Sequence, residues 1–215
     1  MSARMDSELG FIHRYFPAKR EDANTLLTLH GTGGDEDDLI SLARMIDPVA
    51  AILSPRGKAL ENGMPRFFRR FAEGVFDVED LRFRTAELAD FISAASKKYG
   101  FDPRSVVVVG YSNGANIGAS LLLLRPETMK SAILFRAMLP LKPEKKPDLT
   151  GKEVFISGGT YDSMIPREGT IALQKTLEDD GAKVTMNWED STHSLVSVEV
   201  RKAKEWLHKR DTRIL

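Results

Sequence analysis

The feature that most restricts the fold of this chain is a glycine-flanked serine directly after an apolar run. Ser105–Val109 is the most strand-like segment, and it continues into Gly110-Tyr111-Ser112-Asn113-Gly114. This G-x-S-x-G spacing is typical of a serine on a sharp, strained turn between a strand and a helix. Glycine is needed on both sides because larger side chains would collide with the neighbouring strand and helix. An alternative stays open, in which the serine only caps the helix.

Further apolar runs recur along the chain and are separated by segments of helical periodicity. This alternation predicts an α/β fold with a mostly parallel central sheet and helices on both faces. We see no domain boundary and expect one domain over residues 1–215. The expected strands are Leu26–Leu29, Ala50–Leu53, Ser105–Val109, Ala132–Phe135, Val154–Ile156 and Val184–Trp188, with an antiparallel entry strand at Phe11–Phe16. The expected helices are Asp80–Tyr99, Ile171–Leu177 and a last one through Val196, Val200, Ala203 and Leu207.

The composition of the 215 residues excludes several functional classes. There is no cysteine, so disulfides, thiolate zinc sites and a cysteine nucleophile are ruled out. Lys plus Arg and Asp plus Glu both number 31, and such a balance gives no overall field toward nucleic acid or an anionic membrane. The apolar runs are too short to span a bilayer. We therefore expect no nucleic-acid partner, no membrane insertion and a cytoplasmic location, and the sequence leaves a homodimer open.

A glycine-rich loop follows the first expected parallel strand. Leu26–Leu29 runs into His30-Gly31-Thr32-Gly33-Gly34. In a hydrolase with a serine on such a turn, one oxyanion donor is a backbone N–H of this loop, and the other belongs to the residue after the serine. These donors would be Thr32 and Asn113. A plain turn or a weak phosphate cradle are the alternatives, although the loop lacks the lysine of a P-loop.

Two neighbours of this loop have structural rather than catalytic interpretations. His30 is expected to brace the loop. The four acids Asp35-Glu36-Asp37-Asp38 are expected at a helix start, where they would answer the helix dipole rather than bind a metal.

A carboxylate and a histidine follow two later strands in the order that a Ser-Asp-His triad requires. Asp162 lies just beyond Val154–Ile156, and His193 lies beyond Val184–Trp188. Open α/β sheets place their sites at these carboxyl ends of strands. His193 would take the proton of Ser112, and Asp162 would fix the imidazole tautomer. Asp190 is the rival acid, but it shares a short loop with His193 and is expected to cap locally.

With these residues assembled, the chain resembles the phospholipase/carboxylesterase family of small α/β-hydrolases. That family includes bacterial carboxylesterases and, more distantly, acyl-protein thioesterases. The resemblance implies an α/β-hydrolase fold and hydrolysis of carboxylic esters or thioesters, with no cofactor. We expect a carboxylesterase that works through an acyl-enzyme, and we expect no metal, because the chain has no cysteine and no H-E-x-x-H motif. A lysophospholipase or an acyl thioesterase is the alternative, and a small-ligand receptor on the same fold is an alternative of another class. The matching motifs are His30 to Gly34, Ser54-Pro55-Arg56-Gly57, Pro65 to Arg69, Gly110 to Gly114, Asp162 to Pro166, and His193.

The site of such an enzyme is expected to be open. Residues 136–151 are too few for a cap domain between two strands. The segment Pro55–Glu79 is the expected wall, and its apolar side chains could line an acyl or aryl pocket, which favours small-molecule esters with short acyl chains or aryl groups. Equally, its phenylalanines could anchor the segment to the core. The expected pocket residues are Met64, Phe67, Phe68 and Ile165.

Overall fold

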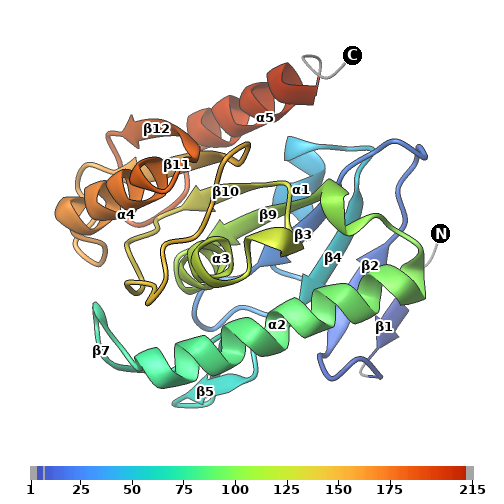
Figure 1. Cartoon of the computed structure of the whole chain (residues 1–215), viewed down its shortest axis with the longest axis horizontal. Helices are drawn as coiled ribbons and strands as arrows, with labels where there is room; N and C mark the ends of the chain where they lie inside the picture. The colour runs from blue at the N-terminus through green and yellow to red at the C-terminus, as the bar shows by residue number, and fades with distance from the viewer. Residues whose placement is uncertain (1–3, 7, 212–215) are drawn as a thin grey trace.

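An eight-stranded sheet organises the computed structural model, which describes residues 4–6 and 8–211 (Figure 1). The strand order is β1-β2-β4-β3-β9-β10-β11-β12, and the six strands from β4 to β12 in this order are parallel. Antiparallel β1 and β2 extend the sheet at one edge. The strands are β1 (Arg4–Asp6), β2 (His13–Phe16), β3 (Thr25–Leu29), β4 (Ala51–Pro55), β9 (Val106–Tyr111), β10 (Ser131–Phe135), β11 (Glu153–Gly159) and β12 (Lys183–Glu189).

Helices cover both faces of this sheet, and the strand side chains explain why. Alternate residues of a strand point to opposite faces. Accordingly, Val106 and Val108 of β9 join the core cluster under α2, α3 and α4, while Val107 and Val109 join the cluster under α1 and α5. Figure 1 shows the same two layers. The helices are α1 (Ile40–Ile46), α2 (Val78–Tyr99), α3 (Asn113–Leu124), α4 (Arg167–Asp179) and α5 (Ser197–Asp211), with short 3-10 turns at Pro103–Ser105 and Pro126–Thr128.

The ends of α2 illustrate how local chemistry sets the helix bounds. The Asp77 carboxylate accepts a hydrogen bond from the Asp80 N–H, which starts the helix two residues before the expected position. Gly100 ends it in the left-handed conformation, at φ 74°, where glycine carries no steric cost. The predicted α/β fold class is confirmed, and each expected parallel strand is present with its bounds within three residues of the expected ones.

Two local expectations differ from the structure. The four acids do not lie in the first turn of a helix, because α1 begins only at Ile40 and has no acid in its first turn. Instead, Glu36 pairs with Arg56, and Asp37 pairs with Arg14. The entry strand is also shorter than expected, since β2 begins at His13.

The wall segment Pro55–Glu79 folds into two small hairpins rather than an irregular loop. They are β5 (Ala59–Glu61) with β6 (Met64–Arg66), and β7 (Arg70–Ala72) with β8 (Val75–Phe76). By contrast, residues 136–152 between β10 and β11 contain no helix or strand, so no cap domain is inserted there. Among the described residues, no helix has the length and apolar character needed to cross a membrane.

Candidate active site

Ser112 occupies a strained turn between β9 and α3. Its backbone has φ 53° and ψ −115°, and such a positive φ is rarely adopted by residues other than glycine. The flanking glycines permit this turn. A Cβ on Gly114 would lie 2.0 Å from the Leu29 carbonyl oxygen, and one on Gly110 would lie 2.6 Å from the Ala115 Cα. We call residues 110–114 the elbow, and its glycine spacing is a steric requirement of this packing.

The histidine and the carboxylate expected for a triad reach Ser112 from β12 and β11. His193 Nε2 lies 2.9 Å from Ser112 Oγ, and its Nδ1 lies 2.9 Å from Asp162 Oδ2. An ionised carboxylate can only accept, so Nδ1 carries the ring proton and Nε2 is left to accept from the serine hydroxyl. The three side chains therefore form one hydrogen-bonded chain that can move a proton from serine to histidine.

The Asp162 carboxylate is oriented by backbone hydrogen bonds to the oxygen that does not face His193. Its Oδ1 accepts hydrogen bonds from the backbone N–H groups of Met164 and Ile165, at 2.9 and 3.0 Å. The side chain is only 1% exposed, which fixes Oδ2 toward His193. The rival acid Asp190 instead accepts a hydrogen bond from Thr160 Oγ1.

The glycine-rich loop after β3 lies beside the elbow. A Cβ on Gly31 would approach the Tyr111 ring to 2.9 Å. Among the hydrogen bonds of the described residues, none uses the backbone N–H of Thr32 or Asn113, whereas Gly33 N–H donates to the Pro65 carbonyl. Both residues line the cavity at Ser112, so two free backbone donors are available beside the serine.

His30 braces this loop. It is 1% exposed, its Nδ1 lies 2.7 Å from the Gly31 carbonyl oxygen, and its Nε2 accepts from the Gly57 N–H at 2.9 Å. Both ring nitrogens are thus occupied in the neutral form, and burial lowers the pKa of His30 below its usual value. The side chain connects the loop after β3 to the wall segment.

Comparison with known proteins identifies the family of this chain. Residues 15–210 match the family described as Phospholipase/Carboxylesterase. The chain belongs to this family. It is 50% identical over 183 residues to the Bacillus subtilis protein named "Putative hydrolase MhqD", covering 85% of this chain and 92% of that protein.

Solved structures of two carboxylesterases are also similar to this chain. The Bacillus cereus carboxylesterase shares 49% identity with a TM-score of 0.89, and the match covers 91% of this chain and 92% of that chain. A carboxylesterase from Mesorhizobium loti shares 31% identity with a TM-score of 0.89, over 96% and 98% of the two chains. The fold and the general class of activity are thus those of carboxylesterase-family hydrolases.

In this member of the phospholipase/carboxylesterase family, a cavity of about 310 Å³ opens beside Ser112. Expected pocket residues Met64 and Ile165 line it. Phe67 and Phe68 do not, because they are 2% and 0% exposed and belong to the core cluster. The remaining lining residues are Thr32, Arg66, Arg70, Glu73, Gly74, Phe76, Tyr111, Asn113, Asn116, Met138, Met164 and His193.

Several residues around this site were not found from the sequence. Tyr111, inside the elbow motif, donates its hydroxyl to the His193 carbonyl at 3.0 Å, and burial raises its pKa. Arg66 donates to Thr32 Oγ1 at 2.6 Å and pairs with Glu61, which also pairs with Arg70. The one sequence signal for Tyr111 was its place in the elbow motif. Arg66 and Arg70 of the wall segment show no sequence spacing that would have predicted their place at the cavity.

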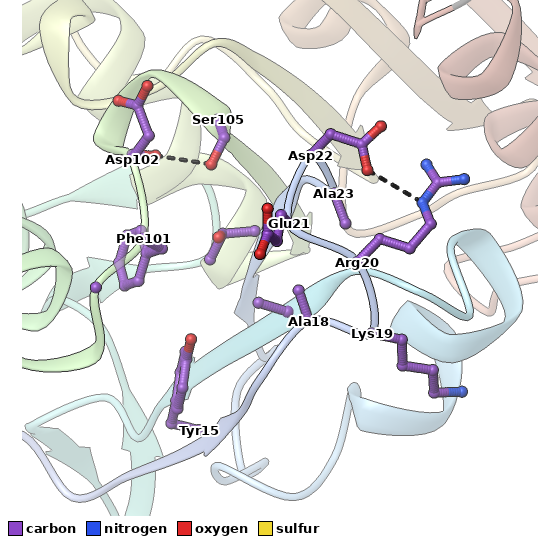
Figure 2. Close-up of a pocket in the computed structure, with 13 residues that line it drawn as sticks. Tyr15, Ala18, Lys19, Arg20, Glu21, Asp22, Ala23, Phe101, Asp102 and Ser105 are labelled. Atoms are coloured by element: carbon purple, nitrogen blue, oxygen red, sulfur yellow. Dashed lines mark hydrogen bonds and ion pairs between the residues drawn. The ribbon is translucent and has the colours of Figure 1, made fainter.

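A second hollow, of about 540 Å³, lies at the opposite ends of the parallel strands from Ser112 (Figure 2). Thr25, Ala51 and Ser105, at the amino ends of β3, β4 and β9, lie along it. In Figure 2, Arg20 reaches toward Asp22, and Ser105 bonds to the Asp102 backbone. This hollow has no serine–histidine pair, so the catalytic candidate remains the cavity at Ser112. The described part of the chain also contains no group of three or more histidine, aspartate and glutamate side chains arranged to hold a metal ion.

Proposed function

We propose that this chain is a serine esterase that hydrolyses carboxylic esters through a Ser112–His193–Asp162 triad. The observation that carries the proposal is the position of His193, whose two ring nitrogens lie 2.9 Å from Ser112 Oγ and from Asp162 Oδ2. A base within hydrogen-bond reach of the nucleophile, itself oriented by a third group, is the signature of an activated serine.

The proposed reaction follows from this arrangement. Ser112 Oγ attacks the ester carbonyl carbon while His193 Nε2 takes its proton, and the negative oxygen that forms is held by the N–H groups of Thr32 and Asn113. When the intermediate collapses, His193 returns the proton to the departing alcohol, and an acyl-serine remains. A water molecule then attacks the acyl carbon with the same proton transfers, which releases the carboxylic acid and free serine.

The cavity favours compact substrates. It combines apolar side chains, namely Met64, Phe76, Met138, Met164 and Ile165, with the polar ends of the elbow. Sites for small molecules are commonly apolar with a few placed polar groups. A volume of about 310 Å³ suits short acyl chains or aryl groups better than long acyl chains. Aryl esters also demand little of His193 as an acid, because their leaving groups depart readily.

The first experiment replaces the proposed nucleophile. Ser112→Ala should lower kcat for a 4-nitrophenyl ester by about 10⁴- to 10⁶-fold, as removal of a triad member does. It should also abolish labelling by a serine-reactive phosphonate, while circular dichroism stays unchanged. Exposed Ser41 on α1 provides the control, since Ser41→Ala should keep wild-type turnover.

The same assay separates the alternatives. Substantial turnover by Ser112→Ala would refute the triad. Rapid phosphonate labelling of the wild type with negligible turnover across aryl esters and acyl thioesters would point to a small-ligand receptor. A higher kcat/KM for thioesters, or for long acyl chains, would assign the enzyme to the acyl thioesterase or lysophospholipase alternative.

A further inference from the structure

Arg136 is a fully buried charged residue next to the triad. It follows β10 directly, its side chain is 0% exposed, and its backbone has φ 57°. A non-glycine residue held in this left-handed region is uncommon, and such residues cluster at functional sites. Its N–H donates to the Ser157 carbonyl at 2.8 Å, which fixes it against β11.

One side of the Arg136 guanidinium is anchored in the core. Nη1 and Nη2 donate to the two oxygens of Glu199, at 2.7 and 2.8 Å, and Glu199 is also 0% exposed. Glu199 further accepts from Ser157 Oγ and from the Val196 N–H. A bidentate pair between a guanidinium and a carboxylate holds both groups in one orientation.

The other side of the guanidinium contacts residues 190–196, which we call the histidine loop. Nε donates to the Thr192 carbonyl at 3.1 Å, and Nη2 donates to the Ser194 carbonyl at 2.7 Å and to Ser191 Oγ at 2.9 Å. The residues immediately before and after His193 are therefore bound by one side chain. Arg136 Nε also lies 3.9 Å from Asp162 Oδ2, on the acid's side of the triad.

We propose that Arg136 is a positioning residue that holds His193 in line with Ser112 and Asp162 by binding the histidine loop on both sides of the ring. This role rests on the proposed function. A planar guanidinium presents five N–H groups outward in a fixed plane, and one N–H of Nη2 is shared between two of its three acceptors, so Arg136 can join Glu199 to three acceptors of the loop. A lysine keeps the charge but has only three donors on one atom, so it cannot make the same set of bonds.

The test compares Arg136→Lys with a buried arginine far from the triad. Arg210 is 7% exposed and donates to Ser131 Oγ at the start of β10, so Arg210→Lys is the matched control. We expect Arg136→Lys to lower kcat about 10- to 100-fold, because small misplacements of reacting groups have effects of this size. KM should change less than twofold, since Arg136 does not line the cavity. Arg210→Lys should change thermal stability and leave kcat within twofold.

A spectroscopic measurement separates positioning from a loss of stability. The proton on His193 Nδ1, shared with Asp162, should give a low-field NMR resonance in the wild type and in Arg210→Lys. In Arg136→Lys it should broaden or disappear while the amide spectrum remains folded. If Arg136→Lys unfolds, the pair Arg136→Met/Glu199→Gln carries the same comparison, because it removes both charges of this buried pair together.

The possible outcomes are distinct. A folded Arg136 variant with wild-type kcat and an intact low-field resonance would overturn the positioning role while leaving the triad untouched. Full activity in Ser112→Ala would instead overturn the proposed function itself, whatever the Arg136 variants do.

Discussion

The elbow and the histidine loop meet at the same edge of the sheet, but different forces hold them. The elbow is fixed by close contact between backbones, where Gly110 and Gly114 leave no room for a Cβ. The histidine loop is fixed mainly by hydrogen bonds with side chains outside it, chiefly Arg136, Glu199 and the Tyr111 hydroxyl. One close backbone contact also supports it, since a Cβ on Gly159 would lie 2.4 Å from the Thr192 carbonyl oxygen.

This difference has a chemical reason. The elbow must lift a small hydroxyl on a sharp turn, and steric exclusion restricts a backbone to one path. The histidine must keep its ring oriented between a donor and an acceptor, which requires bonds with direction. We therefore expect the elbow to respond mainly to changes of size, and the histidine loop to respond to the loss of individual polar groups.

After loss of the nucleophile itself, the largest expected effect comes from the acid that orients His193. Backbone N–H groups bind Asp162 Oδ1, so in Asp162→Asn the amide oxygen should stay there and the NH₂ should face His193 Nδ1. The ring would then carry its proton on Nε2 and could not accept from Ser112. We expect kcat to fall about 10⁴-fold with an unchanged fold.

Asp190→Asn is the matched control, because Asp190 accepts from Thr160 rather than from His193. The kcat of Asp190→Asn, measured by steady-state kinetics on one aryl ester, should be near the wild-type value. A reversed order of the two variants would mean that the acid has been misassigned.

The same contrast explains what could be predicted from the sequence. The elbow, the glycine-rich loop and the parallel strands are local patterns, so their residues stand together in the chain. The supports of the histidine loop come from far away, since Arg136 precedes Ser194 by 58 residues and Tyr111 precedes His193 by 82. The only local signal for Arg136 was a charged residue directly after the apolar run Ala132–Phe135.

The wall segment was predicted only in part for a related reason. An apolar side chain near a site can either line it or pack beneath it, and the sequence does not distinguish the two. The structure places Phe68 in the core and Met64, 43% exposed, at the cavity. The ring of Phe68 contacts that of Phe76 edge-on, with centroids 5.2 Å apart, so it supports a lining residue without lining the cavity itself.

The second prediction tests which apolar side chains of the wall segment line the cavity and which only pack in the core. Phe68→Ala should lower the free energy of unfolding by about 3–5 kcal/mol. In Phe68→Ala, the ratios of kcat/KM among acyl chain lengths should remain within twofold of wild type. Met64→Ala should change the unfolding free energy by about 0.5 kcal/mol or less, as exposed substitutions do. It should shift the difference in activation free energy between acetyl and butyryl esters, obtained from the ratio of their kcat/KM values, by about 1–3 kcal/mol per lost contact.

Denaturant unfolding and a series of 4-nitrophenyl esters measure both quantities. An equal shift of substrate preference in the two variants would show that Phe68 shapes the cavity as directly as Met64 does.

The smallest expected effect concerns Tyr111, which belongs to the elbow and supports the histidine loop. Its hydroxyl donates to the His193 carbonyl, and burial raises its pKa, so the phenol keeps its proton and remains a donor at neutral pH. Tyr111→Phe removes this one bond and keeps the ring that packs against His193, with centroids 5.4 Å apart. One hydrogen bond contributes about 0.5–1.5 kcal/mol, so we expect kcat/KM to fall about 2- to 10-fold.

Tyr99→Phe controls for the loss of a hydroxyl, because Tyr99 OH lies 2.7 Å from His13 Nε2 on a different part of the sheet. Tyr99→Phe should lower the free energy of unfolding by about 0.5–1.5 kcal/mol, the contribution of one hydrogen bond, and leave kcat/KM unchanged. The Tyr111 effect should also be smaller than that of Arg136→Lys, since Tyr111 binds one carbonyl of the histidine loop, whereas Arg136 binds three of its acceptors. If Tyr111→Phe is instead the more damaging change, the orientation of His193 depends chiefly on the elbow, and the two regions are not held independently.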